Sequence, residues 1–425
     1  MEKKLDSKKT YNWQKFISFF LLAFFIVMIL QWIFADYYKG AGQTIILFWI
    51  FGGLLGYLLS RCRFGFLGPI KRLVNNGDGR QARLMILMMT LSTLIAGFII
   101  AGFGTTLAGN ASIGLGVILG GFVFGLAMVF AGGCASGILT DGGKGTLGAF
   151  IVIIFFSLGA FIGAILNVYT SELNFLQGDG TNYSNLSSNY GWLIGIIINL
   201  VLFSILLVVI KLVEIKKQKT NPLYIKQDVR KTENNVETDD KKNFWQELYY
   251  KAFVEKWSWH IGAILLALWF GAYISATKGT SGVAGGYTNW GAWILWLFGY
   301  HDLGIHGLVI NNKEVISAAK ISAGPLKDTG AMFNLSIIIG AMFYFLSSNN
   351  FKFGRPKTWL KPIILAVAGL GMGIGAKIAG GCNLGAMWFG ISVFKGSGWF
   401  FTIFMVIGAV LGLCIQRKVT TCRRD

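Results

Sequence analysis

The sequence has few charged residues for its length. Asp, Glu, Lys and Arg make up 13% of its 425 residues, whereas a soluble domain averages about 25%. Long apolar runs are present instead, for example at residues 16–35 and 84–108. A stretch of about 20 apolar residues crosses the hydrocarbon core of a membrane as a helix. The composition therefore excludes an ordinary soluble protein and predicts an all-α polytopic membrane protein.

Sequence signatures of metal, haem and nucleotide sites are also lacking. The sequence has three histidines and five cysteines, with no C-x-x-C pair and no histidine near a cysteine in the chain. It has no G-x-x-x-x-G-K-[ST] phosphate loop, which disfavours a primary pump. We therefore expect no cofactor and no structural metal. The formal net charge of +19 is better explained by basic cytoplasmic loops than by nucleic-acid binding.

Hydropathy predicts ten spanning helices. They lie near residues 16–35, 42–60, 84–108, 114–131, 146–168, 191–213, 258–276, 331–348, 360–379 and 397–416. The stretch 290–300 is too short to span, and we predict a half-helix that dips into the membrane there. A cleaved signal peptide is the alternative for the first run. Its apolar core exceeds the usual length of about 7–15 residues, which favours an anchored helix.

The basic residues predict the orientation and the division of the chain. The N-terminus, the segment 61–83 and the C-terminal tail are basic, whereas residues 169–190 contain no lysine or arginine. Both termini are therefore expected in the cytoplasm. Residues 1–213 and 257–425 form two predicted membrane halves, and the polar segment 214–256 is a cytoplasmic linker. A flexible tether is the simpler interpretation of the linker, and a scaffold that docks a soluble partner is the alternative.

A repeat links the two predicted halves. The sequence Ala-Gly-Gly-Cys at 131–134 recurs at 379–382, and the glycines at 121 and 125 have counterparts at 369 and 373. The predicted helices before the two cysteines cross the membrane in opposite directions, so the copies are expected to be inverted and related by a pseudo-two-fold axis. Inverted repeats with interrupted helices are a recurring design of transporters, with the solute site near the repeat interface.

The repeated motif predicts a solute path. Its residues are Gly132, Gly133 and Cys134 in one copy and Gly380, Gly381 and Cys382 in the other. Paired glycines let a helix turn without a Cβ clash, and the freed backbone groups must line a cavity or be buried in protein. A cysteine there offers a soft thiol, while the next helix N-terminus favours an anion. We therefore predict a path for a small sulfur-containing anion. Close helix packing around an inert buried cysteine is the alternative.

Four further residues are candidates for substrate binding. Cys62 lies between two arginines at the end of the second predicted helix. Lys377 lies inside an apolar helix, where a charge is costly and is either functional or extended toward an interface. Lys144 and Lys395 flank the cysteine segments, where they either attract an anion or are ordinary loop residues.

The motifs resemble the YeeE/YedE sulfur-transport family, whose bacterial members include thiosulfate importers of the inner membrane, and the resemblance implies that location for this chain. The resemblance rests on the two Gly-Gly-Cys motifs, on Arg-x-Arg-Phe at 61–64 and on Asp-Gly-Arg at 78–80. It implies a monomeric or loosely associated, non-enzymatic importer, in which three cysteines along a central passage relay thiosulfate by S–H···S contacts without a covalent intermediate. Cys134 and Cys382 match two of these cysteines, and the third is expected close to Gly65, where Cys62 is the nearest cysteine. A cytoplasmic TusA-type sulfur carrier is an implied partner beside membrane lipid.

The substrate and the activity have alternatives. A selenium compound or another sulfur oxyanion would suit the same family. A membrane thiol oxidoreductase is a less favoured interpretation, because it would need two cysteines within disulfide reach.

Overall fold

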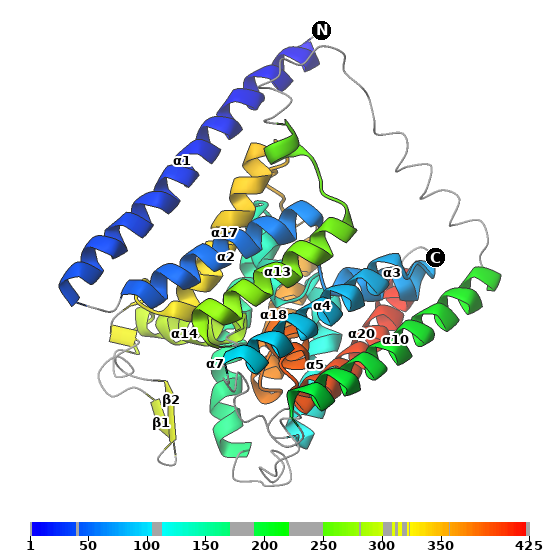
Figure 1. Cartoon of the computed structure of the whole chain (residues 1–425). Coiled ribbons are helices and arrows are strands. Elements are labelled where there is room, and N and C mark those ends of the chain that lie inside the picture. The colour runs from blue at the N-terminus through cyan, green and yellow to red at the C-terminus, as the bar shows by residue number, and fades with distance from the viewer. Residues whose placement is uncertain are drawn as a thin grey trace.

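The computed structural model describes most of the chain. The described residues are 2–39, 42–103, 113–170, 191–220, 250–279, 282–300, 308–310, 313–316, 321–322, 324–356 and 358–421. Among them, ten helices are long and apolar enough to cross a membrane, which confirms the predicted number. The protein is an all-α polytopic membrane protein with one short β-hairpin in its described part (Figure 1).

The ten spanning helices agree closely with the hydropathy pattern. They are α1 (Glu2–Lys39), α2 (Gly42–Cys62), α4 (Arg80–Phe103), α5 (Leu115–Ala131), α7 (Leu147–Thr170), α10 (Trp192–Thr220), α13 (Trp259–Thr277), α17 (Thr329–Ser347), α18 (Leu360–Ile378) and α20 (Gly396–Thr421). Helix α10 continues to Thr220, so the start of the predicted linker is helical. Most of that linker and nearly all of the predicted outer loop 169–190 lie outside the described residues.

Shorter elements lie between the spanning helices. They are α3 (Leu67–Asn76), α6 (Ala135–Gly143), the π-helices η2 (Tyr250–Val254) and η3 (Asn383–Phe389), α14 (Val283–Leu297), α19 (Gly390–Ser392), β1 (Leu308–Ile310) and β2 (Lys313–Ile316). Helix α14 contains most of the predicted half-helix and begins several residues earlier. Helices α6 and η3 directly follow the two cysteines, where hydropathy predicts only a break. These two short helices position the candidate site.

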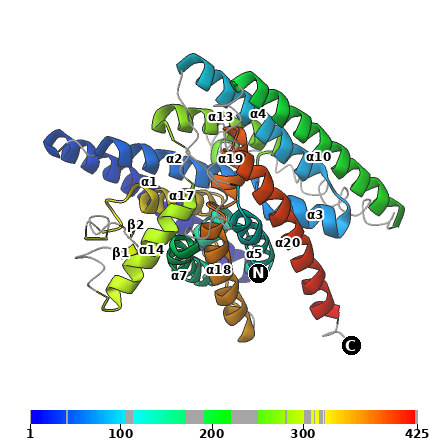
Figure 2. The same cartoon turned by 90° about the horizontal axis from the view of Figure 1, so that it is seen from below.

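Glycines let four central helices pack closely. Helix α5 packs on α20, and α18 packs on α7 (Figure 2). A side chain at Gly125 would overlap the carbonyl of Met405, and one at Gly373 would overlap the carbonyl of Phe156. Small residues permit such backbone contacts between helices within a membrane. Gly125 and Gly373 are matched positions of the repeat, so each copy packs its glycine face on the second helix of the other copy.

The outer helices leave apolar side chains on the surface. Only 6% of the most apolar window of α1 and 17% of that of α10 are buried. These helices lie at opposite edges of the molecule in both views (Figures 1 and 2). Between them and the centre, α2 packs on α17 and α13 packs on α4. The outer surface is thus apolar, as expected of a protein surrounded by lipid.

A buried arginine ties the chain before α13 to the end of α2. Arg61 is 1% exposed. It donates hydrogen bonds to the carbonyl of Glu255 at 3.0 Å and to the Tyr57 hydroxyl. Its guanidinium carbon lies 3.7 Å from the ring centroid of Trp257. A buried charge needs such partners, so the contacts hold the segment before α13 at this end of the molecule.

The turn from α3 to α4 is held by charge. Asp78 accepts hydrogen bonds from the backbone N–H of Arg80 at 3.1 Å and from its guanidinium at 3.0 Å. Burial by itself would raise the pKa of the Asp78 carboxyl, but the bonds and charge of Arg80, with the charge of Arg72, bring that pKa below its ordinary value. The ionised carboxylate therefore stabilises this turn.

Candidate functional site

Two glycines form the breaks that the repeat predicts. Gly132 ends α5 with φ +87°, and Gly380 follows α18 with φ +75°. This left-handed conformation favours glycine because other residues would suffer a Cβ clash. The Gly132 N–H donates to the Met128 carbonyl at 3.1 Å, which closes the last turn of α5. The chain then reaches Cys134 through the buried Gly133, and it reaches Cys382 through the buried Gly381.

Cys134 caps the N-terminus of α6. Its sulfur accepts a hydrogen bond from the Gly137 N–H at 3.4 Å and lies 3.5 Å from the Ser136 hydroxyl. Cysteine is a weak acceptor, so this contact orients the thiol without strongly engaging it. The thiol therefore lies beside the positive end of a short helix.

Cys382 begins η3 and is fully buried. The backbone N–H groups of Leu384 and Gly385 face its sulfur. The amide of the next residue, Asn383, donates to the Met405 sulfur at 2.8 Å, which ties η3 to α20. Gly385 lies against Gly282, the residue before α14. The second break is thus enclosed by α20 on one side and by the start of α14 on another.

Tyr287 joins the two breaks. It is fully buried on α14 and lies near both Cys134 and Cys382. Its hydroxyl donates to the carbonyl of Ala135, the residue after Cys134, at 3.0 Å. The two thiols also lie near each other, and neither forms a disulfide bond. We refer to Cys134, Cys382 and Tyr287 as the thiol cluster.

A cavity of about 500 Å³ reaches Cys134. Its described lining includes three basic residues, Arg63, Lys144 and Lys352, and one acidic residue, Asp141. The excess of positive charge, together with the backbone of Gly132 and Gly133, favours a small anion. We call this space the Cys134 cavity.

Backbone pairing places two of the lysines side by side. The Lys352 N–H donates to the Lys144 carbonyl at 3.3 Å, and the Gly354 N–H donates to the Gly145 carbonyl at 3.3 Å. The turn after α6 is therefore fixed to the chain that follows α17. This contact brings Lys144 and Lys352 side by side in the lining of the Cys134 cavity.

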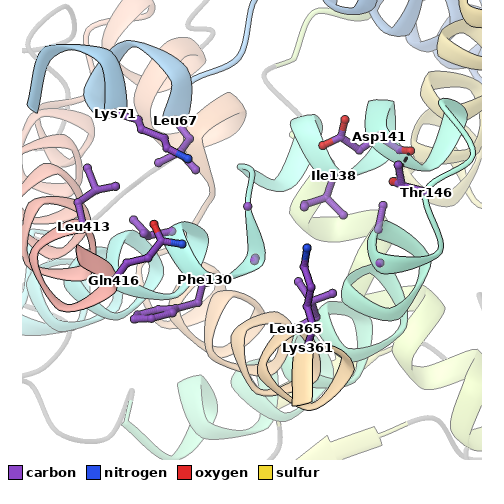
Figure 3. Close-up of a pocket in the computed structure, with 15 residues that line it drawn as sticks. Leu67, Lys71, Phe130, Ile138, Asp141, Thr146, Lys361, Leu365, Leu413 and Gln416 are labelled. Atoms are coloured by element: carbon purple, nitrogen blue, oxygen red, sulfur yellow. Dashed lines mark hydrogen bonds between the residues drawn. The ribbon is translucent and has the colours of Figure 1, made fainter. Parts of the chain in front are cut away.

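A second cavity, of about 280 Å³, also borders the Gly132 turn. Figure 3 shows Lys71 and Lys361 projecting from α3 and α18 into the same space, with Gln416 nearby. Gly132, Ile138 and Asp141 line this cavity, and Gly132 and Asp141 also line the Cys134 cavity. Two neighbouring cavities lined by lysines thus adjoin the break at Gly132 and helix α6. We call the smaller one the Lys361 cavity.

Cys62 is placed differently from the two motif cysteines. Its side chain is 1% exposed and lies against Gly262 of α13. Of the described residues that line the Cys134 cavity, none is Cys62, whereas Arg63 and Gly65 both belong to the lining. A Cβ atom at Gly65 would have no other atom within 4 Å. The position where the resemblance expects the third cysteine therefore faces open space and is a glycine here.

Lys377 and Lys395 lie away from both cavities. Lys377 is half-buried in the last turn of α18, beside Gly163 of α7. Lys395 is half-buried between α19 and α20, beside Gly390. Both lie in the part of the chain that surrounds the second break, and their expected attraction for an anion stays a prediction.

Comparison with known proteins identifies the family. The family described as sulphur transport matches residues 61–411. The chain belongs to the sulphur transport family. It is a multi-pass membrane transporter of a sulfur-containing anion and not an enzyme. This family matches the resemblance that the Gly-Gly-Cys motifs indicated.

Two thiosulfate transporters are similar over most of their length, and a probable transporter is similar over a shorter stretch. The thiosulfate transporter TsuA of Escherichia coli (strain K12) is 24% identical over 363 residues, which cover 84% of this chain and 91% of the relative. TsuA of Spirochaeta thermophila is 26% identical over 378 residues, covering 84% and 94%. The probable transporter YedE of Escherichia coli (strain K12) is 29% identical over 169 residues, which are 40% of each chain.

Three site residues carry no clear signal in the sequence. Tyr287 lies in a segment that hydropathy marks only as apolar, Asp141 lies in a short helix that was not predicted, and Lys352 belongs to a basic loop. For Tyr287, the sequence indicates only that a tyrosine lies close to the predicted half-helix. Their roles depend on chain segments that meet only in the folded protein.

Proposed function

We propose that this chain takes up thiosulfate, or a closely related small sulfur-containing anion, across the bacterial inner membrane. The central observation is the thiol cluster, which joins the two Gly-Gly-Cys breaks next to a basic cavity. The anion passes Cys382 and then Cys134 before it enters the Cys134 cavity. Two similar proteins are named thiosulfate transporters, which supports thiosulfate as the substrate.

Passage in this proposal is non-covalent. A thiol S–H is a weak hydrogen-bond donor, suited to the polarizable terminal sulfur of thiosulfate, while backbone N–H groups at the two breaks serve its oxygens. Weak contacts made in sequence allow the anion to leave as well as to enter. Arg63, Lys144 and Lys352 then hold the anion loosely at the exit. No step forms a bond to sulfur.

The proposed orientation places the Cys134 cavity on the cytoplasmic side. The basic segments at both termini are cytoplasmic, and residues 1–213 and 257–425 form two inverted halves joined by the linker 214–256. The matched contacts of Gly125 with Met405 and of Gly373 with Phe156 support this symmetry. Lys377 and Lys395 then lie toward the outer side, where they attract the anion to Cys382. Lipid surrounds α1 and α10, and a monomer contains the whole path.

The same orientation gives a soluble carrier access to the exit. A TusA-type sulfur carrier in the cytoplasm would meet the basic mouth formed by Lys144 and Lys352. Charge complementarity of this kind mainly speeds encounter and selects partners. Binding of such a carrier is part of the proposal and not needed for passage of the anion.

Uptake of labelled thiosulfate into proteoliposomes tests the proposed function. The wild-type protein should accumulate the label, and Cys134→Ala and Cys382→Ala should abolish uptake at equal protein content. Cys414→Ala is the matched control, because Cys414 is an exposed cysteine on α20. Normal uptake by both path variants would contradict the proposed relay.

Competition by unlabelled anions for uptake of labelled thiosulfate identifies the preferred substrate. Unlabelled thiosulfate should compete best, while stronger competition by selenite or sulfite would favour a selenium compound or another sulfur oxyanion. A Cys134–Cys382 disulfide found by mass spectrometry after mild oxidation would instead favour the thiol oxidoreductase.

A further inference from the structure

We infer that Tyr287 is a gate that also binds the anion: its ring separates Cys382 from the Cys134 cavity, and its hydroxyl donates to the passing substrate. The inference rests on the proposed function, because it assigns the step between the two thiols to a third residue. Tyr287 lies in α14, which belongs to neither copy of the Gly-Gly-Cys repeat.

The position of Tyr287 is the first argument. Its side chain is fully buried and lies near both thiols, and its hydroxyl donates to the Ala135 carbonyl at 3.0 Å. Ala135 directly follows Cys134. A route from one thiol to the other therefore runs close to this residue.

The accessibility of the two thiols is the second argument. The cavity of about 500 Å³ reaches Cys134, and its lining among the described residues includes neither Cys382 nor Tyr287. Cys382 and Tyr287 are both 0% exposed. The cavity thus ends at Cys134, which is itself 1% exposed, and reaches neither of the other two residues. Tyr287 lies at that boundary.

The surroundings of α14 indicate which part moves. A side chain at Gly291 would overlap the carbonyl of Ser157 on α7, and one at Gly286 would overlap the carbonyl of Gly330 on α17. The backbone of α14 is thus in close contact on two sides and cannot shift without disturbing both helices. Rotation of the Tyr287 side chain, away from the Phe156 ring whose centroid is 4.2 Å away, opens the path at lower cost.

The Tyr287 hydroxyl can exchange its acceptor, the Ala135 carbonyl, for the passing anion. In the closed state it donates to Ala135, a neutral carbonyl in the first turn of α6. That carbonyl is also the acceptor for a later N–H of the helix, so it keeps a hydrogen bond when the tyrosine leaves. A hydrogen bond to an anion is roughly twice as strong as one to a neutral carbonyl. The arriving anion therefore draws the hydroxyl away from α6 and opens its own passage.

Uptake by Tyr287→Phe tests the donor role. This variant keeps the ring and loses the hydroxyl, so the kcat/KM for thiosulfate should fall about tenfold, equivalent to about 1.4 kcal/mol. Tyr273→Phe is the matched control, because Tyr273 is also fully buried and its hydroxyl bonds Thr277 on α13, outside the thiol cluster. The control removes a hydrogen bond of the same kind but outside the proposed path, so its kcat/KM should stay within about twofold of wild type.

A labelling experiment tests the gate without relying on transport. A small membrane-impermeant methanethiosulfonate reagent is added on the side of the Cys134 cavity, and modification of Cys382 is followed by mass spectrometry. Tyr287→Ala should raise the rate of Cys382 modification, whereas Tyr273→Ala should not. Size-exclusion chromatography checks that each variant is folded, and Tyr287→Leu, which also removes the ring, serves if Tyr287→Ala is not.

The two readouts separate this inference from the proposed function. If the wild-type protein takes up no thiosulfate, the proposed function is wrong, and the labelling result still tests the gate. If the wild-type protein takes it up and Tyr287→Phe is within about twofold of it, the donor role is wrong while the proposed function stands. Unchanged Cys382 labelling in a folded Tyr287→Ala variant overturns the gate.

Discussion

Gly125 of α5 packs directly on the backbone carbonyl of Met405 of α20, so closely that no larger residue fits between the helices. The corresponding contact, between Gly373 of α18 and Phe156 of α7, has the same form. These contacts join the segments around the two cysteines. They explain glycines that otherwise look like a generic packing motif.

Replacement of these glycines should destabilise the protein. Gly125→Ala and Gly373→Ala each place a methyl group against backbone, and overpacking of this kind costs about 1–3 kcal/mol. Thermal unfolding of the detergent-solubilised protein should show a lower melting temperature for both. Gly102→Ala is the control, because a Cβ atom at Gly102 meets no other atom within 4 Å. Equal melting temperatures for all three variants would contradict the close packing.

Neutral substitutions of the lysines that line the Cys134 cavity should slow uptake. Lys144→Gln and Lys352→Gln each remove a positive charge that lines the cavity, so a several-fold loss of uptake is expected, larger at low ionic strength because salt screens the field. Lys361→Gln removes a charge from the other cavity and is the matched control. A larger effect at Lys361 would place the exit in the Lys361 cavity instead.

Thiol reactivity tests which of positions 62 and 65 lines the path. Cys62 is buried against Gly262, so it should react slowly with an impermeant thiol reagent, and Cys62→Ala should reduce uptake less than Cys134→Ala. In the Cys62→Ala background, Gly65→Cys should react rapidly, because position 65 lines the cavity and has open space around it. Loss of uptake in Cys62→Ala as complete as in Cys134→Ala would assign Cys62 to the path.

Acid should weaken the turn between α3 and α4. The pKa of the Asp78 carboxyl in the folded protein is below its ordinary value, because the hydrogen bonds and charge of Arg80, with Arg72, outweigh the opposite effect of burial. The ionised carboxylate therefore stabilises the folded protein at pH values above the ordinary pKa of an aspartate. This contribution is lost as pH falls below about 4. Melting temperature should fall in that range for wild type and depend less on pH for Asp78→Asn. Parallel curves for the two proteins would contradict the assignment.

Much of the architecture follows from local features of the chain. Each of the ten spanning helices is a run of apolar residues long enough to cross the membrane, and such a run forms a helix because lipid offers no partner for the backbone. The breaks at Gly132 and Gly380 are equally local, since a positive φ strongly favours glycine. The repeat identified Cys134 and Cys382 because a duplicated cysteine is visible without knowledge of the fold.

The remaining features of the site depend on contacts between distant segments. Tyr287 bonds Ala135 across 152 positions, and no local pattern marks a residue whose partner lies so far away. The π-helix after Cys382 and the burial of Cys62 likewise depend on neighbours supplied by other helices. Short segments were enough to define the helices, their breaks and the paired thiols, because hydropathy and glycine conformation are local properties. Which groups meet those thiols could be known only from the folded protein, since it depends on how the helices pack.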